Sequence, residues 1–193
     1  MTTNETGTLQ QEVEALEQEI MAKKQALTAL RRRLPAVPVT QDYVFTAPDG
    51  STQPLSALFG QQNELILIHN MGVRCQYCAL WSDGFNGVLK HLQNRAAFVV
   101  VTPDPPATLG AQAKLRGWDF PVYSHAGTSF SADMGMAEGD DESPGVSTFV
   151  KAADGSIQRV GRSLFGPGDD FAPIWHLFDL LPPGRDWDPK ASY

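Results

Sequence analysis

The chain begins with a long segment, residues 8–34, in which apolar positions recur with helical spacing. No Gly or Pro interrupts it, and it is rich in strong helix formers such as Glu, Gln, Lys, Ala and Leu. Its apolar positions alternate in steps of four and three and comprise Leu9, Val13, Leu16, Ile20, Leu27, Leu30 and Leu34, with Lys23 at the one remaining position. This heptad spacing predicts a helix, with Thr8 as its N-cap, whose apolar seam packs against another helix.

Three interpretations of this helix remain open. Its seam packs on the rest of its own chain, or it pairs with a second copy, or the arginine run at residues 31–33 contacts nucleic acid. Pro35 and Pro38 predict that the helix ends there and that a linker follows. We therefore expect two parts: residues 1–37, a helix and linker that is a candidate for dimerisation, and residues 38–193, the main domain.

Beyond residue 38 the pattern alternates between short apolar strands and helices. Strands are expected at 43–45, 65–69, 97–102 and 120–123, helices at 55–59 (a single turn), 78–94, 105–116 and 170–181, and a β-hairpin at 146–151 and 156–160. Pro182 and Pro183 are expected to end the last helix. Buried strands joined by a crossover helix are typical of a parallel pair, and the late hairpin is antiparallel. The order predicts an α/β class, with the mixed central sheet and flanking helices of a thioredoxin-like fold.

Composition narrows the class of partner. The 193 residues are 42% hydrophobic and 19% charged, as in a globular domain. Acidic residues outnumber basic ones by 22 to 15, for a net charge of −7 and a pI near 5.0, which argues against nucleic acid and against an anionic membrane surface. No run of about 18 apolar residues is present, and the N-terminus lacks the pattern of a secretory signal. The expected compartment is the cytoplasm.

The candidate chemistry lies in the sequence Cys75-Gln76-Tyr77-Cys78, between a buried strand and a helix. A cysteine at a helix N-terminus has its thiolate stabilised by backbone N–H groups and the helix dipole, and Arg74 adds a positive charge beside it. Cys78 lies one turn later on the same face. We expect Cys75 to be the attacking thiol and Cys78 the resolving one.

Two other interpretations of the cysteine pair compete with thiol chemistry. A zinc site would need further ligands, from a dimer or from nearby histidines, because the chain has no second CxxC. Alternatively, the two cysteines pack without exchanging disulfides. The remaining histidines are scattered and indicate no metal site, and no GxGxxG motif follows a strand, so no organic cofactor is expected.

Residues near the cysteines supply further candidates. His69, six residues before Cys75, is a candidate proton carrier for Cys78, with a hydrogen-bonded core histidine as the alternative. Tyr77 and Trp81 are candidates for an apolar rim that binds a substrate, although Trp81 also fits a core position.

Several sequence blocks occur together and in order: DYVFTAPDG (42–50), CQYCALWSDGFNG (75–87), GWDFP (117–121), PGVSTFV (144–150) and LFDLLPPGRDWDP (177–189). Through these blocks the chain resembles a bacterial family of thioredoxin-like proteins of unknown function, labelled predicted dithiol–disulfide oxidoreductases. The resemblance covers about residues 36–189. It implies a thioredoxin-like fold and, as a label only, a thiol redox activity.

The chain departs from thioredoxins at the positions that shape their active site. Gln76-Tyr77 replaces Gly-Pro between the cysteines, and His69 replaces an acidic residue. Alignment on the strand that faces the CxxC puts Ser147, preceded by Val146, where thioredoxins have a cis-proline, so both are candidate substrate contacts. Peroxiredoxins carry a threonine three residues before the attacking cysteine, where this chain has Gly72.

These observations together predict a dithiol–disulfide oxidoreductase that attacks a disulfide or a peroxide and is recycled by a thiol reductant. The alternatives are a non-catalytic thioredoxin-fold binding or scaffold module, dimerised by its N-terminal helix, and a zinc site shared across a dimer.

Overall fold

The structure is a computed structural model that describes residues 3–139, 141–182, 184 and 186–190. The chain forms two compact units, residues 1–35 and residues 36–193. None of the helices in the described residues is both long enough and apolar enough to cross a membrane.

The first unit is helix α1 (Thr3–Arg31), as the heptad pattern predicts. Thr8 lies inside this helix, so the prediction that it forms the N-cap is wrong. The apolar seam is exposed, from 46% for Leu9 to 65% for Leu34. A single helix has no second layer against which to bury an apolar face, so this unit by itself leaves the seam uncovered.

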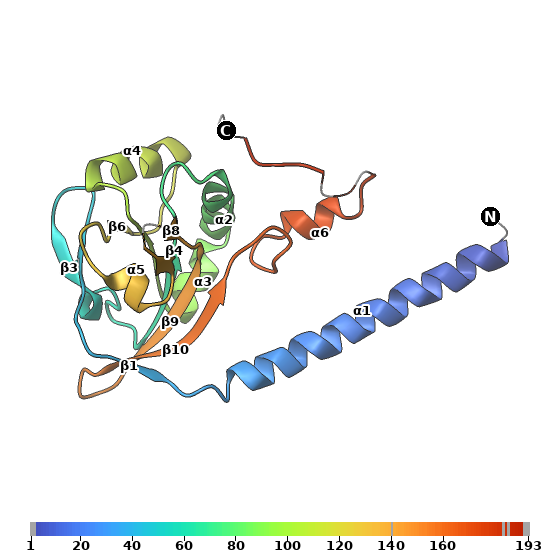
Figure 1. Cartoon of the computed structure of the whole chain (residues 1–193), viewed down its shortest axis with the longest axis horizontal. Helices are drawn as coiled ribbons and strands as arrows, with labels where there is room; N and C mark the ends of the chain where they lie inside the picture. The colour runs from blue at the N-terminus through green and yellow to red at the C-terminus, as the bar shows by residue number, and fades with distance from the viewer. Residues whose placement is uncertain (1–2, 140, 183, 185, 191–193) are drawn as a thin grey trace. The chain divides into compact units, whose positions relative to one another are not determined.

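The second unit is built on a sheet with the strand order β1-β10-β9-β4-β5-β6-β2-β3 (Figure 1). Its strands are β1 (Val37–Val39), β2 (Val44–Thr46), β3 (Thr52–Pro54), β4 (Glu64–His69), β5 (Ala97–Thr102), β6 (Val122–Ser124), β9 (Gly145–Lys151) and β10 (Ile157–Leu164). Strands β4, β5 and β6 are parallel neighbours, whereas β9 is antiparallel to both β4 and β10. A small second sheet pairs β7 (Ala137–Glu138) with β8 (Asp141–Glu142). The central sheet is therefore mixed, as predicted.

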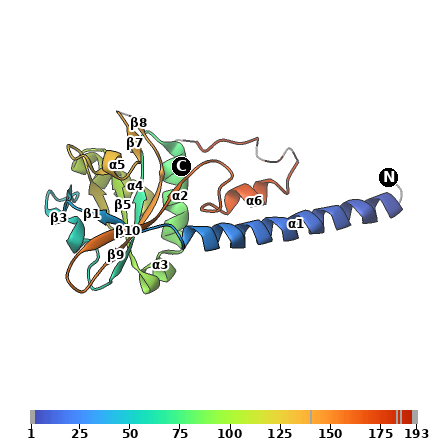
Figure 2. The same ribbon diagram turned by 60° about the horizontal axis from the view of Figure 1, so that its bottom comes forward.

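Helices cover both faces of the sheet and create two cores. Helices α2 (Gln76–Gly87), α3 (Leu89–Arg95) and α4 (Pro106–Arg116) pack on one face, and the 3-10 turn η1 (Leu55–Ala57) and α5 (Phe130–Asp133) pack on the other. Both views show α5 apart from α2 and α3 (Figures 1 and 2). Successive strand residues point to opposite faces, so β4 sends Ile68 to the α2 core and Leu65 and Leu67 to the α5 core.

Some predicted elements differ from those observed. The segment expected to be a linker contains β1, an edge strand that pairs with β10. The helix expected at 78–94 is two helices, α2 and α3, separated at Val88. The helix expected at 170–181 is the shorter α6 (Ile174–Phe178). Pro183, expected to help end it, lies outside the described residues.

Candidate active site

The two cysteines lie where a loop after β4 enters α2. Cys75 is the N-cap of α2, and its Sγ accepts a hydrogen bond of 3.0 Å from the backbone N–H of Cys78. Cys75 is half-buried, while Cys78 is 2% exposed. A disulfide joins the two residues. The pair thus has one partly exposed cysteine at a helix N-terminus and one buried cysteine one turn later, and Arg74 beside them is exposed.

The loop that leads to Cys75 is held by hydrogen bonds to Asn70 and Gly72. The Asn70 side-chain oxygen accepts from the Gly72 N–H (2.8 Å), and the Cys75 N–H donates to the Gly72 carbonyl (3.0 Å). Gly72 has a φ of +104°, and a Cβ there would lie 2.9 Å from the carboxylate oxygens of Asp104. A side chain at position 72 is excluded on both grounds, so the threonine of peroxiredoxins has no counterpart here.

Asp104 connects this loop to the end of β5. Its Oδ2 accepts from the backbone N–H of Val73 (2.8 Å) and from the hydroxyl of Thr102 (2.9 Å). Asp104 is not among the site residues predicted from the sequence. A usable signal was present, because the carboxyl ends of parallel strands meet at one sheet edge and Asp104 follows β5 as the cysteine loop follows β4.

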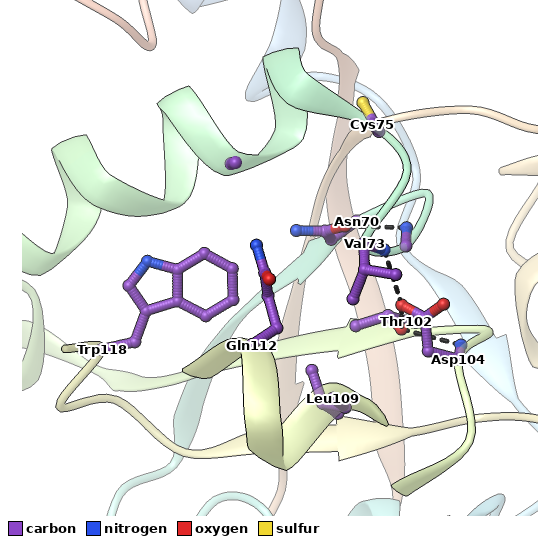
Figure 3. Close-up of a pocket in the computed structure, with 10 residues that line it drawn as sticks. Asn70, Val73, Cys75, Thr102, Asp104, Leu109, Gln112 and Trp118 are labelled. Atoms are coloured by element: carbon purple, nitrogen blue, oxygen red, sulfur yellow. Dashed lines mark hydrogen bonds between the residues drawn. The ribbon is translucent and has the colours of Figure 1, made fainter. Parts of the chain in front are cut away.

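A very small pocket of about 10 Å³, room for roughly one water molecule, lies between Cys75 and these strand ends. Figure 3 shows Asn70, Val73, Thr102 and Asp104 gathered on one side, Trp118 on the other, and Gln112 of α4 between them. The lining combines carboxylate, hydroxyl and amide groups with apolar side chains. Such a pocket offers polar contacts to a small group that approaches the cysteine.

His69 does not face the cysteine pair. Its ring stacks on Phe130 at 5.4 Å, in the α5 core, and its Nε2 lies 2.9 Å from the hydroxyl of Ser147. Cys78 packs in the α2 core, on the opposite face of the sheet. Burial lowers the pKa of His69 to about 3, and the charges of His125, Arg159 and Arg162 act in the same direction. The geometry matches the alternative of a hydrogen-bonded core histidine, not a proton carrier for Cys78.

Val146 and Ser147 occupy opposite faces of β9. Ser147 is fully buried and faces His69, while Val146 packs in the α2 core with Cys75 and Tyr77. Only Val146 of this predicted pair is therefore on the side of the cysteines. The Ser147 side chain points away from the cysteines, so its predicted substrate contact gains no support from this geometry and stays a prediction.

Tyr77 and Trp81 are covered by the C-terminal segment. Trp81 is 2% exposed, and its Nε1 donates to Asp169 (3.3 Å), so it belongs to the core. The Tyr77 hydroxyl donates to Asp188, and this hydrogen bond is the main reason that the pKa of Tyr77 is raised. Tyr77 also lies 5.9 Å from the ring of Trp175, which is almost fully buried. Of the two predicted rim residues, only Tyr77 retains a partly exposed side chain.

Within the described part of the chain, no group of three or more His, Cys, Asp or Glu side chains is placed to hold a metal ion. The polar groups nearest the cysteines, Asn70, Thr102 and Asp104, are instead used in hydrogen bonds to the loop and to one another.

A central mixed sheet, with a CxxC pair at the entry to the helix that follows its central strand, defines a thioredoxin-fold domain. The chain belongs to the family described as bacterial protein of unknown function (DUF899), whose model matches residues 3–193 and thus includes α1. This confirms the resemblance to a thioredoxin-like family of unknown function. None of the curated proteins compared with the chain matches it.

Solved structures share the fold at low sequence identity. Peroxidoxin BcpB from Mycobacterium tuberculosis has a TM-score of 0.51 and 22% identity, covering 64% of this chain and 80% of its own. The bacterioferritin comigratory protein of Xanthomonas campestris has a TM-score of 0.53 and 16% identity, covering 67% and 87%. A hypothetical protein from Sinorhizobium meliloti has a TM-score of 0.51 and 15% identity, covering 82% and 79%. At these identities the likeness establishes the thioredoxin-like fold.

Proposed function

We propose that the chain is a dithiol–disulfide oxidoreductase that works through Cys75 and Cys78. The observation that carries this proposal is the position of the pair. Cys75 caps a helix N-terminus and is the more exposed of the two cysteines, and the buried Cys78 is close enough to form a disulfide with it. Accessibility makes Cys75 the attacking thiol and Cys78 the resolving thiol.

The proposed cycle transfers two electrons from the dithiol to the substrate. The Cys75 thiolate attacks one sulfur of a disulfide R–S–S–R′, forming a mixed disulfide while R′–S⁻ leaves and takes up a proton. The Cys78 thiolate then attacks the Cys75 sulfur, closes the Cys75–Cys78 disulfide and releases R–S⁻, which is protonated. A thiol reductant restores the dithiol. With a hydroperoxide, Cys75 forms a sulfenic acid as the alcohol leaves, and attack by Cys78 releases water.

The residues around Cys75 support the thiolate form. The Cys78 N–H points at the Cys75 sulfur, and the helix N-terminus and the Arg74 charge favour a negative sulfur. We assign no proton transfer to His69, because the sheet lies between it and Cys78. Tyr77 and Val146 remain the proposed substrate contacts from the predicted set.

The substrate is proposed to be a disulfide or a peroxide, met in the cytoplasm. The pocket beside Cys75 is very small and has both polar and apolar lining residues, which suits a compact reacting group better than a bulky one. The Xanthomonas campestris structure is described with alkyl peroxide reduction activity, which makes alkyl hydroperoxides the first peroxides to assay.

One observation favours a second role, that of an assembly module. The exposed apolar seam of α1 suits a partner helix, and a homodimer formed through α1 would be compatible with either an enzyme or a scaffold.

The test is a redox titration of the full chain, quenched by alkylation and read by mass. We expect a reversible two-electron transition between about −200 and −300 mV. The Cys78→Ser variant should trap a mixed disulfide with a small-molecule disulfide, and Cys75→Ser should not. If no intramolecular disulfide forms at any poise, or if both variants trap equally, the proposed mechanism is wrong.

A further inference from the structure

The charges of α1 are divided between its two halves. Its first half carries Glu12, Glu14, Glu17 and Glu19, and basic residues follow from Lys23 onwards, namely Lys23, Lys24 and Arg31, with Arg32 and Arg33 just beyond the helix. Residues 6–22 contain no Lys or Arg. The helix therefore has a negative and a positive half along one seam.

The seam is narrow and suits a single partner helix. Val13, Ile20 and Leu27 occupy one heptad position, a, and Leu9, Leu16, Lys23 and Leu30 occupy the other, d. Apart from Met21, the large apolar side chains of α1 lie at these two positions. Two paired helices bury such a narrow stripe, whereas a helix on a globular core presents a wider apolar face. The apolar members are 46–59% exposed in the chain.

We propose that two copies of this chain associate through α1 as an antiparallel helical pair. The spacing of the seam residues is symmetric about a point between Met21 and Ala22, and this symmetry fixes which residues of the two antiparallel helices lie opposite each other. It places Leu16 opposite Leu27 of the second copy and Val13 opposite Leu30 of the second copy. Every apolar layer is then formed by one a and one d residue.

The flanking charges select this orientation. In the antiparallel alignment Glu17, at position e, lies beside Lys24 of the second copy, and the two-fold axis repeats this attractive pair. The Lys23 side chain packs beside Ile20 of the second copy, next to that copy's Glu19. The negative half of each helix faces the positive half of the other, and the helix dipoles are also opposed.

A parallel pair would bring like charges together. Glu12, at position g, would face Glu17 of the second copy, and the two Lys23 side chains would meet in one layer of the seam. Only Glu19 and Lys24 would attract. The two orientations therefore predict opposite effects for one substitution, Glu17→Lys.

The first experiment is sedimentation equilibrium of the full-length protein over a wide concentration range. Glu17→Lys converts both attractive pairs of the antiparallel dimer into repulsive ones and should raise its dissociation constant about tenfold. The double variant Glu17→Lys with Lys24→Glu restores the pairs and should recover the dimer. Glu14→Lys makes the same charge change outside the seam and serves as the control. Tighter dimerisation of Glu17→Lys would overturn the proposal in favour of the parallel pair.

A distance measurement gives an independent test of orientation. A spin label at Gln10→Cys, in a Cys75→Ser and Cys78→Ser background, should show a separation of about 35 Å in an antiparallel dimer and about 10 Å in a parallel one. A separation near the shorter value, or a monomer at all concentrations, would overturn the proposal. Neither measurement depends on thiol chemistry. A failure of the dimer proposal can therefore be distinguished from a failure of the proposed redox function.

Discussion

Replacing Asp104 by alanine should loosen the loop that positions Cys75. One carboxylate oxygen of Asp104 accepts both the Val73 N–H (2.8 Å) and the Thr102 hydroxyl (2.9 Å). These contacts tie the loop after β4 to the end of β5. Asp104→Ala removes both hydrogen bonds, whereas Asp104→Asn keeps an oxygen acceptor of the same size in the same place.

The expected cost follows from the surroundings of the two donors. A hydrogen bond to a charged group contributes about 1.5–3 kcal/mol. The Val73 N–H is exposed and can bind water instead, so its loss lies below this range, whereas Thr102 is 1% exposed and its hydroxyl loses its acceptor. We expect Asp104→Ala to lower the free energy of unfolding by about 2–3 kcal/mol and Asp104→Asn by about 1 kcal/mol.

Urea unfolding of the disulfide-bonded protein at pH 7 measures this difference. With a slope of about 2 kcal/mol per molar urea, the midpoint should fall by about 1–1.5 M for Asp104→Ala and by about half that or less for Asp104→Asn. Hydrogen exchange at the Val73 amide should accelerate in the alanine variant. An unchanged midpoint for Asp104→Ala, or equal losses for both variants, would refute the role assigned to this carboxylate.

Two further predictions concern the cores. Burial holds the pKa of His69 near 3, below its ordinary 6.5, so the unfolded chain binds a proton that the folded chain does not, and this contribution to stability is lost as the pH falls from about 6.5 towards 3. Between pH 7 and pH 5 this effect should lower the free energy of unfolding by about 2 kcal/mol. The His69→Gln variant should lack this part of the pH dependence. An equal pH dependence of the unfolding free energy in both proteins would contradict the prediction. Trp175 is 1% exposed, so Trp175→Ala should cost about 3–5 kcal/mol in chemical denaturation, whereas Leu180→Ala, at 82% exposure, should cost almost nothing. Equal effects of the two substitutions would show that α6 does not pack as described.

The central strands could be predicted because they are continuous apolar runs. A strand that helices cover on both faces has no alternation of polar and apolar residues. The strand predicted at 97–102 has the same bounds as β5. The edge strand β1 is hard to predict and resembles a linker in sequence, because it is short and contains Pro38. Proline is tolerated at an edge, where one side of the strand needs no donor, so its presence there did not exclude a strand.

The predicted last helix is longer than α6 because hydrogen bonds to the Asp169 side chain hold its expected first turn in a loop. The Asp169 carboxylate accepts from the backbone N–H groups of Gly166, Phe171 and Ala172. These bonds hold the chain in a loop up to Pro173, and α6 begins only after it. Such local competition by Asp for backbone donors is difficult to weigh from sequence alone.

The position of the cysteines was predicted correctly, but the faces around them were not. The strand before Cys75 was identified, yet whether His69 points towards α2 or α5 depends on which helix covers which face, and that is a tertiary property. The face that the Ser147 side chain occupies is equally hard to predict, since a shift of one residue along a strand reverses the direction of its side chain.

The hydrogen bond between Tyr77 and Asp188 spans 111 residues and begins between the two cysteines. Asp188 thus takes part in the surroundings of the reactive turn. A substitution such as Asp188→Ala would change the surroundings of Tyr77 without touching either sulfur. Activity measurements should therefore compare forms with and without an intact Asp188 contact, before a weak activity is attributed to the cysteines themselves.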